Sequence, residues 1–400
     1  MYTDKELNKL NQDVYFVDPE FNDKVTYVAK PDNELVGKEK NQLTVSGKKF
    51  KVVASADIDN NGYQGFAVAP ITKEYPQGDI NNVAVISAGT HPDWKNPVDL
   101  VTAITAKNTS DGGSLQTKQA DDFVNFVINE QGYNVTQLSG YSQGAYMLKV
   151  GAKYKIPTTV FNGWFLYDSL NEDEKKFMME NPYLFKNYRR LDDSTVKYLD
   201  GNDREKITDF GTVFWFDGES HGIKDWKFDK NGNIIFEATS SPTVKMSQIA
   251  YQASLKKWHL FQLRKKFSAS GSEMSTNEEI YLDDSEALLV VEAAAKMNET
   301  ISKSLKKKYQ NAITQAEELW QKTEQAAQNI GTTLSCIEEI KSLEAGGASK
   351  QTIVNIPVSK YEEKIAKIDS QTAEYNSLIA EIKTSIAKLV ASDQKLASQI

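Results

Sequence analysis

The stretch Asn134–Tyr154, NVTQLSGYSQGAYMLKVGAKY, decides the fold of the first half of the chain. A β-rich run enters the turn Gly140-Tyr-Ser142-Gln-Gly144, and an amphipathic helix leaves it. A G-x-S-x-G turn in this context projects the serine hydroxyl from the end of a strand, and its small residues let strand and helix approach closely. The pattern predicts a nucleophilic Ser142; the alternative is an ordinary glycine-rich turn between a strand and a helix.

Strand-like and helix-like runs alternate on both sides of this turn. The predicted helices are 121–130 and 143–153, and the predicted strands are 50–54, 65–71, Val83–Ser87, 135–138, Thr158–Phe161, 196–199 and Val213–Phe216. A short, wholly apolar run such as Val83–Ser87 is typical of a buried central strand. The order predicts an α/β domain with a mostly parallel sheet flanked by helices.

A nucleophilic serine needs a base, and in this chain order the acid and then the histidine follow the serine. His221 lies in a loop of small residues directly after the predicted strand Val213–Phe216, so we expect it to be the base. His259 lies in a run that reads as a packed helix. His91 precedes the serine in the chain, so we expect it to line the wall of the active-site pocket and not to act as the base.

The acid should also follow a strand. The predicted strand 196–199 leads into Asp200-Gly-Asn-Asp203, and the turn would carry Asp203 beyond the strand end, towards the histidine loop. Asp203 is therefore the expected acid, with Asp200 in reserve and Asp209 more remote. The alternative is that an aspartate in this turn only caps its own backbone.

Acyl transfer also needs backbone donors for the oxyanion that forms. One is expected from Gln143, the residue after the nucleophile. The other is expected from the loop after Val83–Ser87, where Gly89 permits the turn and the hydroxyl of Thr90 adds a further donor.

Composition excludes several other classes of protein. The 400 residues carry a net charge of −8, whereas nucleic-acid binding normally needs a basic stripe. Cys336 is the only cysteine, and there are three histidines, so the sequence indicates no disulfide, no metal centre and no cofactor. The first residues, MYTDKELNKLNQD, have no apolar core of a signal peptide, and no run reaches the length of a membrane span.

Composition also changes sharply near residue 270. Residues 273–400 contain no His, Arg or Phe, and they hold three of the 22 glycines and one of the ten prolines. Aromatic residues, glycine and proline on one side and helix formers on the other predict an α/β domain at 1–267, a linker at 268–277 and a helical domain at 278–400.

The helical domain has a clear period. Apolar residues recur in steps of four and three from Leu305 to Ile340, and again from Tyr361 to Leu389. This spacing is the signature of helices wound on partner helices. Capping-box spacing at Ser275 and Ser359 predicts two helix starts. We expect a helical hairpin of the coiled-coil type that needs a further helical partner, or alternatively a bundle closed within the chain by 280–298.

Together, these motifs resemble a known family. Gly89-Thr90 after a strand, Asp93-Trp94, Gly140-Tyr-Ser142-Gln-Gly144, Gly-Asn-Asp203 and Ser220-His221 look like the α/β-hydrolase lipases of Gram-positive bacteria, over roughly residues 45–265. The resemblance implies an α/β-hydrolase fold, a triad of Ser142, Asp203 and His221, and lipid or other carboxylic esters as substrates.

The whole chain resembles a narrower group, the lipase toxins of the type VII secretion system with reversed domain order. In that group an LXG-like helical domain follows the enzyme; here the tail has no Leu-x-Gly or Trp-x-Gly turn. The resemblance implies a phospholipase-type toxin that leaves the cytoplasm without a cleavable signal peptide. It also implies small helical partners at the tail, an immunity protein against the lipase domain and transient contact with a membrane surface.

Two other functions remain open at this point. One is an intracellular serine esterase or peptidase that its coiled-coil tail oligomerises, and the other is a non-catalytic hydrolase-fold protein that binds partners through its tail. The segment 171–188, in which large apolar residues stand among charges, is a candidate lid over an apolar cleft; it is equally well an ordinary helix between strands.

Overall fold

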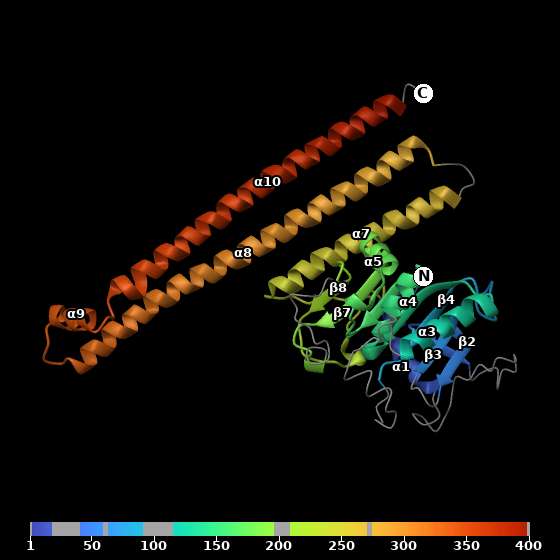
Figure 1. The fold of residues 1–400 in the computed structure, drawn as a ribbon, viewed down its shortest axis with the longest axis horizontal. Helices are drawn as coiled ribbons and strands as arrows, with labels where there is room; N and C mark the ends of the chain where they lie inside the picture. Colours follow the sequence, from blue (N-terminus) through green and yellow to red (C-terminus); the bar gives the residue numbers. More distant parts are fainter. Residues whose placement is uncertain are drawn as a thin grey trace. The chain divides into compact units, whose positions relative to one another are not determined.

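The computed structural model describes residues 2–17, 41–58, 63–90, 115–195, 209–269 and 274–397. The chain divides into two compact units, Met1–Ser254 and Leu255–Ile400 (Figure 1). The division falls inside a long helix, α7 (Pro242–Ala269), and therefore earlier than the boundary predicted at residue 267. No glycine or proline follows Pro242 within α7, so nothing in the sequence stops the helix there. The predicted linker at 268–277 spans the break between α7 and the next helix.

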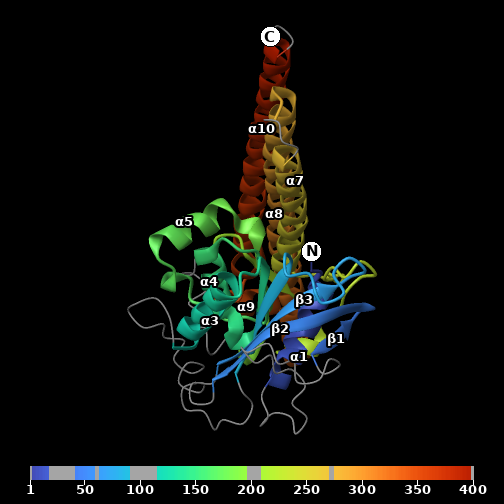
Figure 2. The ribbon, with the colours of Figure 1, turned by 90° about the vertical axis from the view of Figure 1, so that its right-hand side faces the viewer.

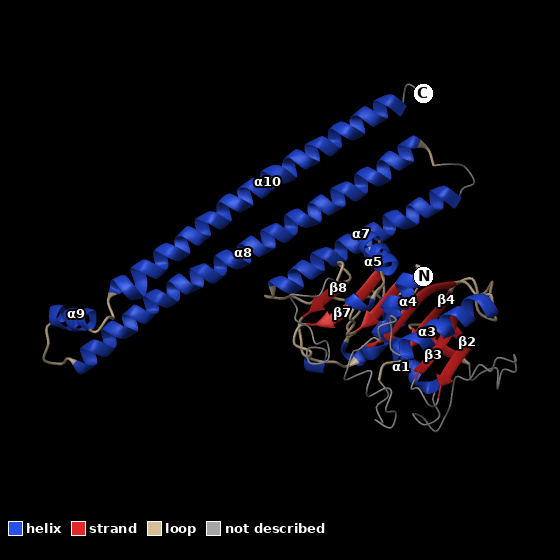
Figure 3. Ribbon diagram, in the orientation of Figure 1, coloured by secondary structure: helices blue, strands red, loops and turns tan. Residues whose placement is uncertain are grey.

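An eight-stranded sheet forms the centre of the first unit (Figure 3), and its spatial order follows the sequence. The pairings from β1 to β4 are antiparallel and those from β4 to β8 are parallel. The strands are β1 (Gln42–Val45), β2 (Lys48–Ile58), β3 (Tyr63–Ile71), β4 (Val83–Ser87), β5 (Val135–Tyr141), β6 (Thr158–Phe161), β7 (Phe185–Arg190) and β8 (Val213–Phe216). The predicted α/β class, with helices and a mostly parallel sheet, is confirmed at this level.

Three predicted strands coincide with β4, β6 and β8. Strand β7 was not predicted, because its sequence FKNYRR carries three charges and reads as polar. Distant residues compensate those charges: Lys186 pairs with Asp4, and the guanidinium groups of Arg189 and Arg190 lie over the rings of Trp215 and Trp226. The predicted strand 196–199 lies outside the described residues.

Helices cover both faces of the sheet (Figure 2). Leu138 of β5 belongs to a buried cluster with residues of α3 (Leu115–Asn125) and α4 (Met147–Tyr154). The next residue, Ser139, points to the opposite face, because side chains alternate along a strand. There its hydroxyl accepts a hydrogen bond of 2.7 Å from Asn11 of α1 (Asp4–Asp13), so α1 and the α3–α4 pair lie on opposite faces.

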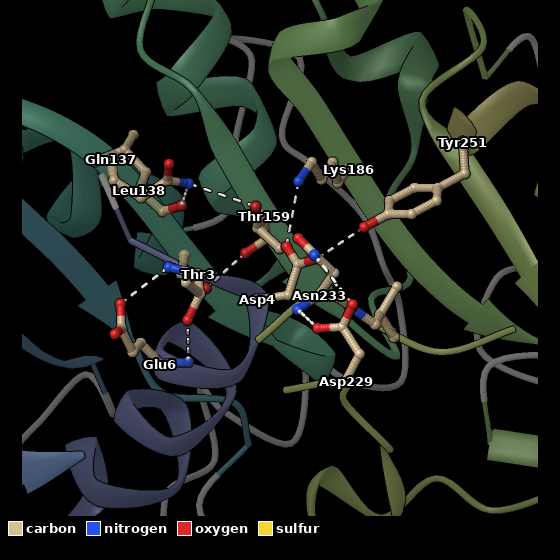
Figure 4. A network of polar contacts seen from close by, with 12 residues as sticks. Thr3, Asp4, Glu6, Gln137, Leu138, Thr159, Lys186, Asp229, Asn233 and Tyr251 are labelled. Carbon is tan, nitrogen blue, oxygen red and sulfur yellow. Dashed lines mark hydrogen bonds and ion pairs between the residues drawn. The ribbon is translucent and has the colours of Figure 1, made fainter. Parts of the chain in front are cut away.

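Buried polar contacts tie α1 to the sheet. Thr3 and Glu6 form a capping box that starts the helix. Asp4 is 4% exposed and accepts hydrogen bonds from Lys186 (3.2 Å) and from the hydroxyl of Tyr251 (3.0 Å), as Figure 4 shows. A buried carboxylate is costly unless it is paired, and here strand β7 and helix α7 supply the donors. The first helix of the chain is therefore part of the core of this unit.

The second unit is built around two long helices, α8 (Thr276–Ile330) and α10 (Ile356–Ala397), and the short helix α9 (Cys336–Ala345) lies where the chain passes from one to the other (Figure 1). The helices lie side by side: Ser302 bonds Thr372, Lys306 pairs with Asp369, and the rings of Tyr309 and Tyr361 are 5.9 Å apart. The predicted hairpin is present. The alternative, a bundle closed by 280–298, is wrong, because those residues continue α8 without a turn.

The end of α7 packs beside the start of α8, through the ion pairs Lys257–Glu286 and Arg264–Asp283. The predicted start of α8 at Ser275 is confirmed by a capping box with Glu278. The predicted start at Ser359 is wrong: α10 begins at Ile356, directly after a π-helical turn, Gln351–Asn355. Pro357 is tolerated in the first turn of α10, where a proline interrupts no hydrogen bond of that helix.

Large apolar side chains remain exposed along both long helices. They include Leu305 and Leu319 of α8 and Leu378, Ile382 and Leu389 of α10, which are 36–63% exposed. Within the described part of the chain, no helix combines the length and the apolar character that a membrane span requires.

Candidate active site

Five consecutive strands bring the candidate residues to one edge of the sheet. Thr90 follows β4, Ser142 follows β5, Asn162 follows β6, Asp193 follows β7 and His221 follows β8. These strands run parallel, so their carboxyl ends share an edge. In open α/β sheets this edge is where ligand sites form.

Ser142 occupies the sharp turn that the sequence predicts. Its φ is 54°, in the left-handed region, which is costly for a serine and recurs at functional sites. A Cβ on Gly140 would lie 2.1 Å from the carbonyl oxygen of Gly144, and one on Gly144 would lie 2.9 Å from that of Ser87. Both glycines are therefore required for the close approach of strand and helix, as the motif implies.

Ser142, His221 and Asp193 form a hydrogen-bonded chain. The Ser142 Oγ lies 2.8 Å from His221 Nε2, and His221 Nδ1 lies 2.7 Å from Asp193 Oδ2. An ionised carboxylate only accepts hydrogen bonds, so Nδ1–H donates to Asp193. In the neutral imidazole Nε2 is then the acceptor, which is the tautomer that a base for the Ser142 hydroxyl needs.

The carboxylate at His221 Nδ1 belongs to Asp193, whereas the sequence analysis expected Asp203 there. Asp203 and its reserve, Asp200, lie outside the described residues, and Asp193 occupies the Nδ1 side of His221. The carboxylate of Asp209 accepts from the Gly211 N–H of its own turn before β8. The strand that precedes Asp193 is β7, which ends at Arg190, ten residues before Asp200. The prediction of Asp203 depended on the strand expected at 196–199, which the described residues do not include.

Asp193 is almost fully buried and is oriented by neighbouring donors. Its Oδ1 accepts from the Thr195 N–H (3.1 Å), and its Oδ2 also accepts from Asn162 Nδ2 (3.2 Å). Hydrogen bonds to the charged form of a carboxylate favour that form. The carboxylate is thus held towards His221 by its own loop and by the loop after β6.

Tyr141, the last residue of β5, stabilises the loop that carries His221. Its hydroxyl donates to the His221 carbonyl at 2.8 Å, and the two rings are 5.5 Å apart. Burial, with a smaller contribution from the negative charge of Asp193, raises the pKa of Tyr141 to about 12. Tyr141 therefore remains a neutral donor throughout the physiological range.

The expected oxyanion donors lie next to each other. Thr90 Oγ1 donates to Gln143 Oε1 at 2.5 Å, and the Gln143 amide in turn contacts Gln116. Gln143 stands at the start of the helical segment after Ser142, and the first N–H groups of a helix have no partner within it. The loop of Thr90 reaches the serine, since a Cβ on Gly89 would lie 3.2 Å from Ser142 Cβ.

His259 lies on α7 and is exposed. His91 lies outside the described residues, so its expected place in a pocket wall stays a prediction.

The segment 171–188 does not form one continuous helix. It holds α5 (Glu172–Glu180), and its last residues, from Phe185, belong to β7 inside the sheet. The buried pair Lys149–Glu174 (2.6 Å) ties α5 to α4, the helix that follows the serine turn. The second reading of this segment, a helix between two strands, is the one that the structure supports.

Sequence reasoning missed three contributors to the site: Asp193, Asn162 and Tyr15. Tyr15, just after α1, accepts a hydrogen bond of 3.0 Å from the Gly89 N–H and so supports the Thr90 loop. A signal for Asp193 was present in the two aromatic residues of β7, Phe185 and Tyr188, and in the two aspartates of the turn that follows, Leu191-Asp-Asp193. Asn162 and Tyr15 carry no local signal, because distant residues determine their positions.

Within the described ranges, no group of three His, Cys, Asp or Glu side chains is arranged to hold a metal ion. Comparison of the chain with protein-family models, with curated proteins and with solved structures finds no match. What the site does is therefore inferred from its geometry and from the resemblance of its motifs.

Proposed function

We propose that this protein is a serine hydrolase of the α/β-hydrolase fold that cleaves carboxylic esters. The observation that carries the proposal is the hydrogen-bonded chain Ser142–His221–Asp193, with the serine on a strained turn at the end of β5. This constellation is recognised by its geometry and by the roles of its members, and its chain order of serine, acid and histidine is the order typical of the fold.

The chemistry follows from the tautomer. His221 Nε2 takes the proton as Ser142 Oγ attacks the ester carbonyl, and Asp193 stabilises the imidazolium that forms. The Gln143 N–H and the Thr90 loop donate to the oxyanion. The imidazolium then protonates the departing alcohol, which leaves an acyl-serine. Water, deprotonated by the same imidazole, releases the carboxylic acid and restores Ser142.

We propose lipid esters, of the phospholipase or lipase type, as the substrates. Support comes from the resemblance of the serine turn, the Gly89-Thr90 loop and Ser220-His221 to lipases of Gram-positive bacteria. An intracellular esterase for small esters is the second candidate, since the same triad serves both. Acyl-chain preference separates them: a lipase prefers long chains in vesicles or micelles, whereas an esterase prefers short soluble esters.

A fluorophosphonate probe tests the proposal directly, because it reacts only with an activated serine. We expect labelling of the full chain at Ser142 and none of the Ser142→Ala variant, with Ser385→Ala, at an exposed position of α10, as a control that keeps its label. A panel of phospholipids, triglycerides and short esters then defines the substrate class. Absence of labelling of the folded wild-type protein would favour a non-catalytic binding protein.

We further propose that the helical unit binds small helical partner proteins and directs export by a type VII system, while the enzyme unit is neutralised before export by an immunity protein. Support comes from the large apolar side chains that stay exposed on α8 and α10. Two helices packed on each other cover only part of their apolar surface, and a further helix would cover the rest. The order of enzyme first and helical domain second matches the secreted lipase toxins described above. Contact with a membrane surface would then be made by the exported enzyme.

Co-expression tests the tail. We expect the full chain to form a stable complex with small helical proteins from its own organism, and to lose it when the exposed Leu378, Ile382 and Leu389 of α10 are all changed to Asp. Ester hydrolysis by that variant should be unchanged, because the triad lies in the first unit. A full chain that binds no such protein would contradict the targeting role and leave the hydrolase proposal intact.

A further inference from the structure

Asn162 lies directly after β6 in an unusual conformation. Its φ is 49°, and its side chain is fully buried. Its own N–H donates to the Tyr188 carbonyl of β7 (2.8 Å), which fixes the backbone there. A non-glycine residue held at positive φ is strained, and such strain persists only where the surroundings enforce it.

The Asn162 amide makes three contacts beyond its own loop. Its Nδ2 donates to Asp193 Oδ2 and to the Ser220 carbonyl, both at 3.2 Å, and its Oδ1 accepts from Trp226 Nε1 at 2.6 Å. An indole N–H only donates and a backbone carbonyl only accepts. The orientation of the amide is therefore determined at both ends by its partners.

We propose that Asn162 is a positioning residue, which holds the acid of the triad and the loop of its histidine in one geometry. A single amide group joins the loop after β7, through Asp193, to the loop after β8, through Ser220, which immediately precedes His221. The oxygen that it contacts, Asp193 Oδ2, is the same oxygen that lies 2.7 Å from His221 Nδ1. The inference rests on the proposed function, and it adds a residue that the triad alone does not include.

The second donor has a chemical consequence. The Nδ2–H group of Asn162 partly offsets the negative charge on Asp193 Oδ2. The carboxylate therefore still orients the His221 imidazole, but it stabilises the protonated imidazolium less strongly. Without this donor, the uncompensated carboxylate stabilises the imidazolium more strongly. His221 would then be protonated, and inactive as a base, up to a higher pH.

Other charged and titratable groups around the pair are known among the described residues. Tyr141 approaches from β5 and stays neutral. Arg190, at the end of β7, lies over the Trp226 ring and donates to the Asp225 carbonyl. The Asp225 carboxylate bonds the Ser220 hydroxyl. Asn162→Gly changes none of these groups, so a shift in that variant reports the Asn162 amide.

Asn162→Gly is the most informative variant, because glycine tolerates the positive φ and only the side chain is lost. We expect kcat/KM for a soluble ester to fall about tenfold, as for loss of one hydrogen bond to a charged group. We expect the acidic limb of its pH profile to move to higher pH by about half a unit. Lys155→Gly is the matched control: Lys155 is exposed, has a φ of 59°, and caps α4.

Trp226→Phe removes the N–H that orients the amide and keeps a smaller aromatic ring against Arg190 and the surrounding aromatic residues. We expect a shift of the pH profile in the same direction but smaller. This variant preserves the test if Asn162→Gly folds poorly.

An NMR titration of the His221 ring in wild-type and variant proteins gives a readout that needs no turnover. We expect its protonation midpoint to rise in Asn162→Gly and to stay unchanged in Lys155→Gly. Unchanged midpoints and pH profiles in Asn162→Gly and Trp226→Phe, with wild-type labelling at Ser142, would overturn the role of Asn162 and leave the hydrolase intact. A wild-type protein that the serine probe does not label would instead overturn the proposed function.

Discussion

The two units bury their apolar residues to very different extents. In the first unit β4 and β6 are buried along their whole length, and the largest buried side chains include Tyr188 and Phe214. In α8 and α10 the buried apolar residues are Leu282, Leu289 and Trp320, while many others of similar size are exposed. A sheet with helices on both faces closes its own core, whereas two long helices side by side leave half of each surface to solvent.

This difference separates the tasks of the two units. The candidate site needs side chains from five strands held at hydrogen-bond distance, and only a closed core supplies that rigidity. The hairpin holds few buried groups and presents a long surface with apolar and charged residues. The following expectations test that contrast, beginning with the largest effect.

Changes at the triad should be the most damaging of all. We expect Ser142→Ala and His221→Ala each to lower kcat by about 10⁶-fold, because the two residues act as a unit. His259→Ala, on the exposed side of α7, should leave kcat unchanged and is the matched control. Inactivation by His259→Ala with an active His221→Ala would show that the base lies elsewhere.

The identity of the acid has the next largest effect. Asp193→Asn should lower kcat by about 10⁴-fold, because an amide favours the wrong tautomer of the imidazole. Asp203→Asn tests our original expectation from the sequence and should retain nearly full activity. The reverse result, measured on the same soluble ester, would return the role of the acid to Asp203.

The same substitution in the two units should differ strongly in its effect on stability. Leu138→Ala in β5 removes a fully buried side chain and should lower the free energy of unfolding of the first unit by about 2–5 kcal/mol. Leu389→Ala in α10, where the side chain is 63% exposed, should change stability by no more than about 0.5 kcal/mol. Chemical denaturation followed by tryptophan fluorescence and circular dichroism measures both. Equal losses would contradict the difference in burial.

The smallest effect concerns the helix starts of the second unit. Hydrogen bonds from Ser275 and Ser335 lower the pKa values of Glu278 and Glu338, respectively. A carboxylate whose pKa is depressed by folding stabilises the fold above its unfolded pKa, and this contribution is lost as the pH falls through the folded pKa. We therefore expect the helices of the tail to lose stability slightly below about pH 4.5.

Changing Glu278 and Glu338 to Gln should flatten that pH dependence, since glutamine keeps the capping geometry without a titrating group. Thermal unfolding followed by circular dichroism between pH 3 and pH 7 is the measurement. A wild-type and a double variant with the same slope would show that the two caps do not contribute.

The elements predicted correctly are those whose sequence carries a local signal. The buried strands Val83–Ser87, Thr158–Phe161 and Val213–Phe216 are short apolar runs, and the serine turn has its two obligatory glycines. Strand β7 carries no such local signal, because Lys186, Arg189 and Arg190 make its sequence read as polar. Its charges are compensated by Asp4, Trp215 and Trp226, which are far away in the sequence.

The sequence by itself determined the α/β class, the helical tail, the sharp turn at Ser142 between its two glycines and the loop that carries His221, because each depends on residues that are neighbours along the chain. Only the tertiary structure decided which carboxylate meets the histidine and which residues support it. Asp193 reaches His221 because β7 and β8 lie side by side, and Asn162 reaches Asp193 because β6 pairs with β7. Such contacts depend on the pairing of strands, and strand pairing is a property of the whole sheet that no single stretch of sequence encodes.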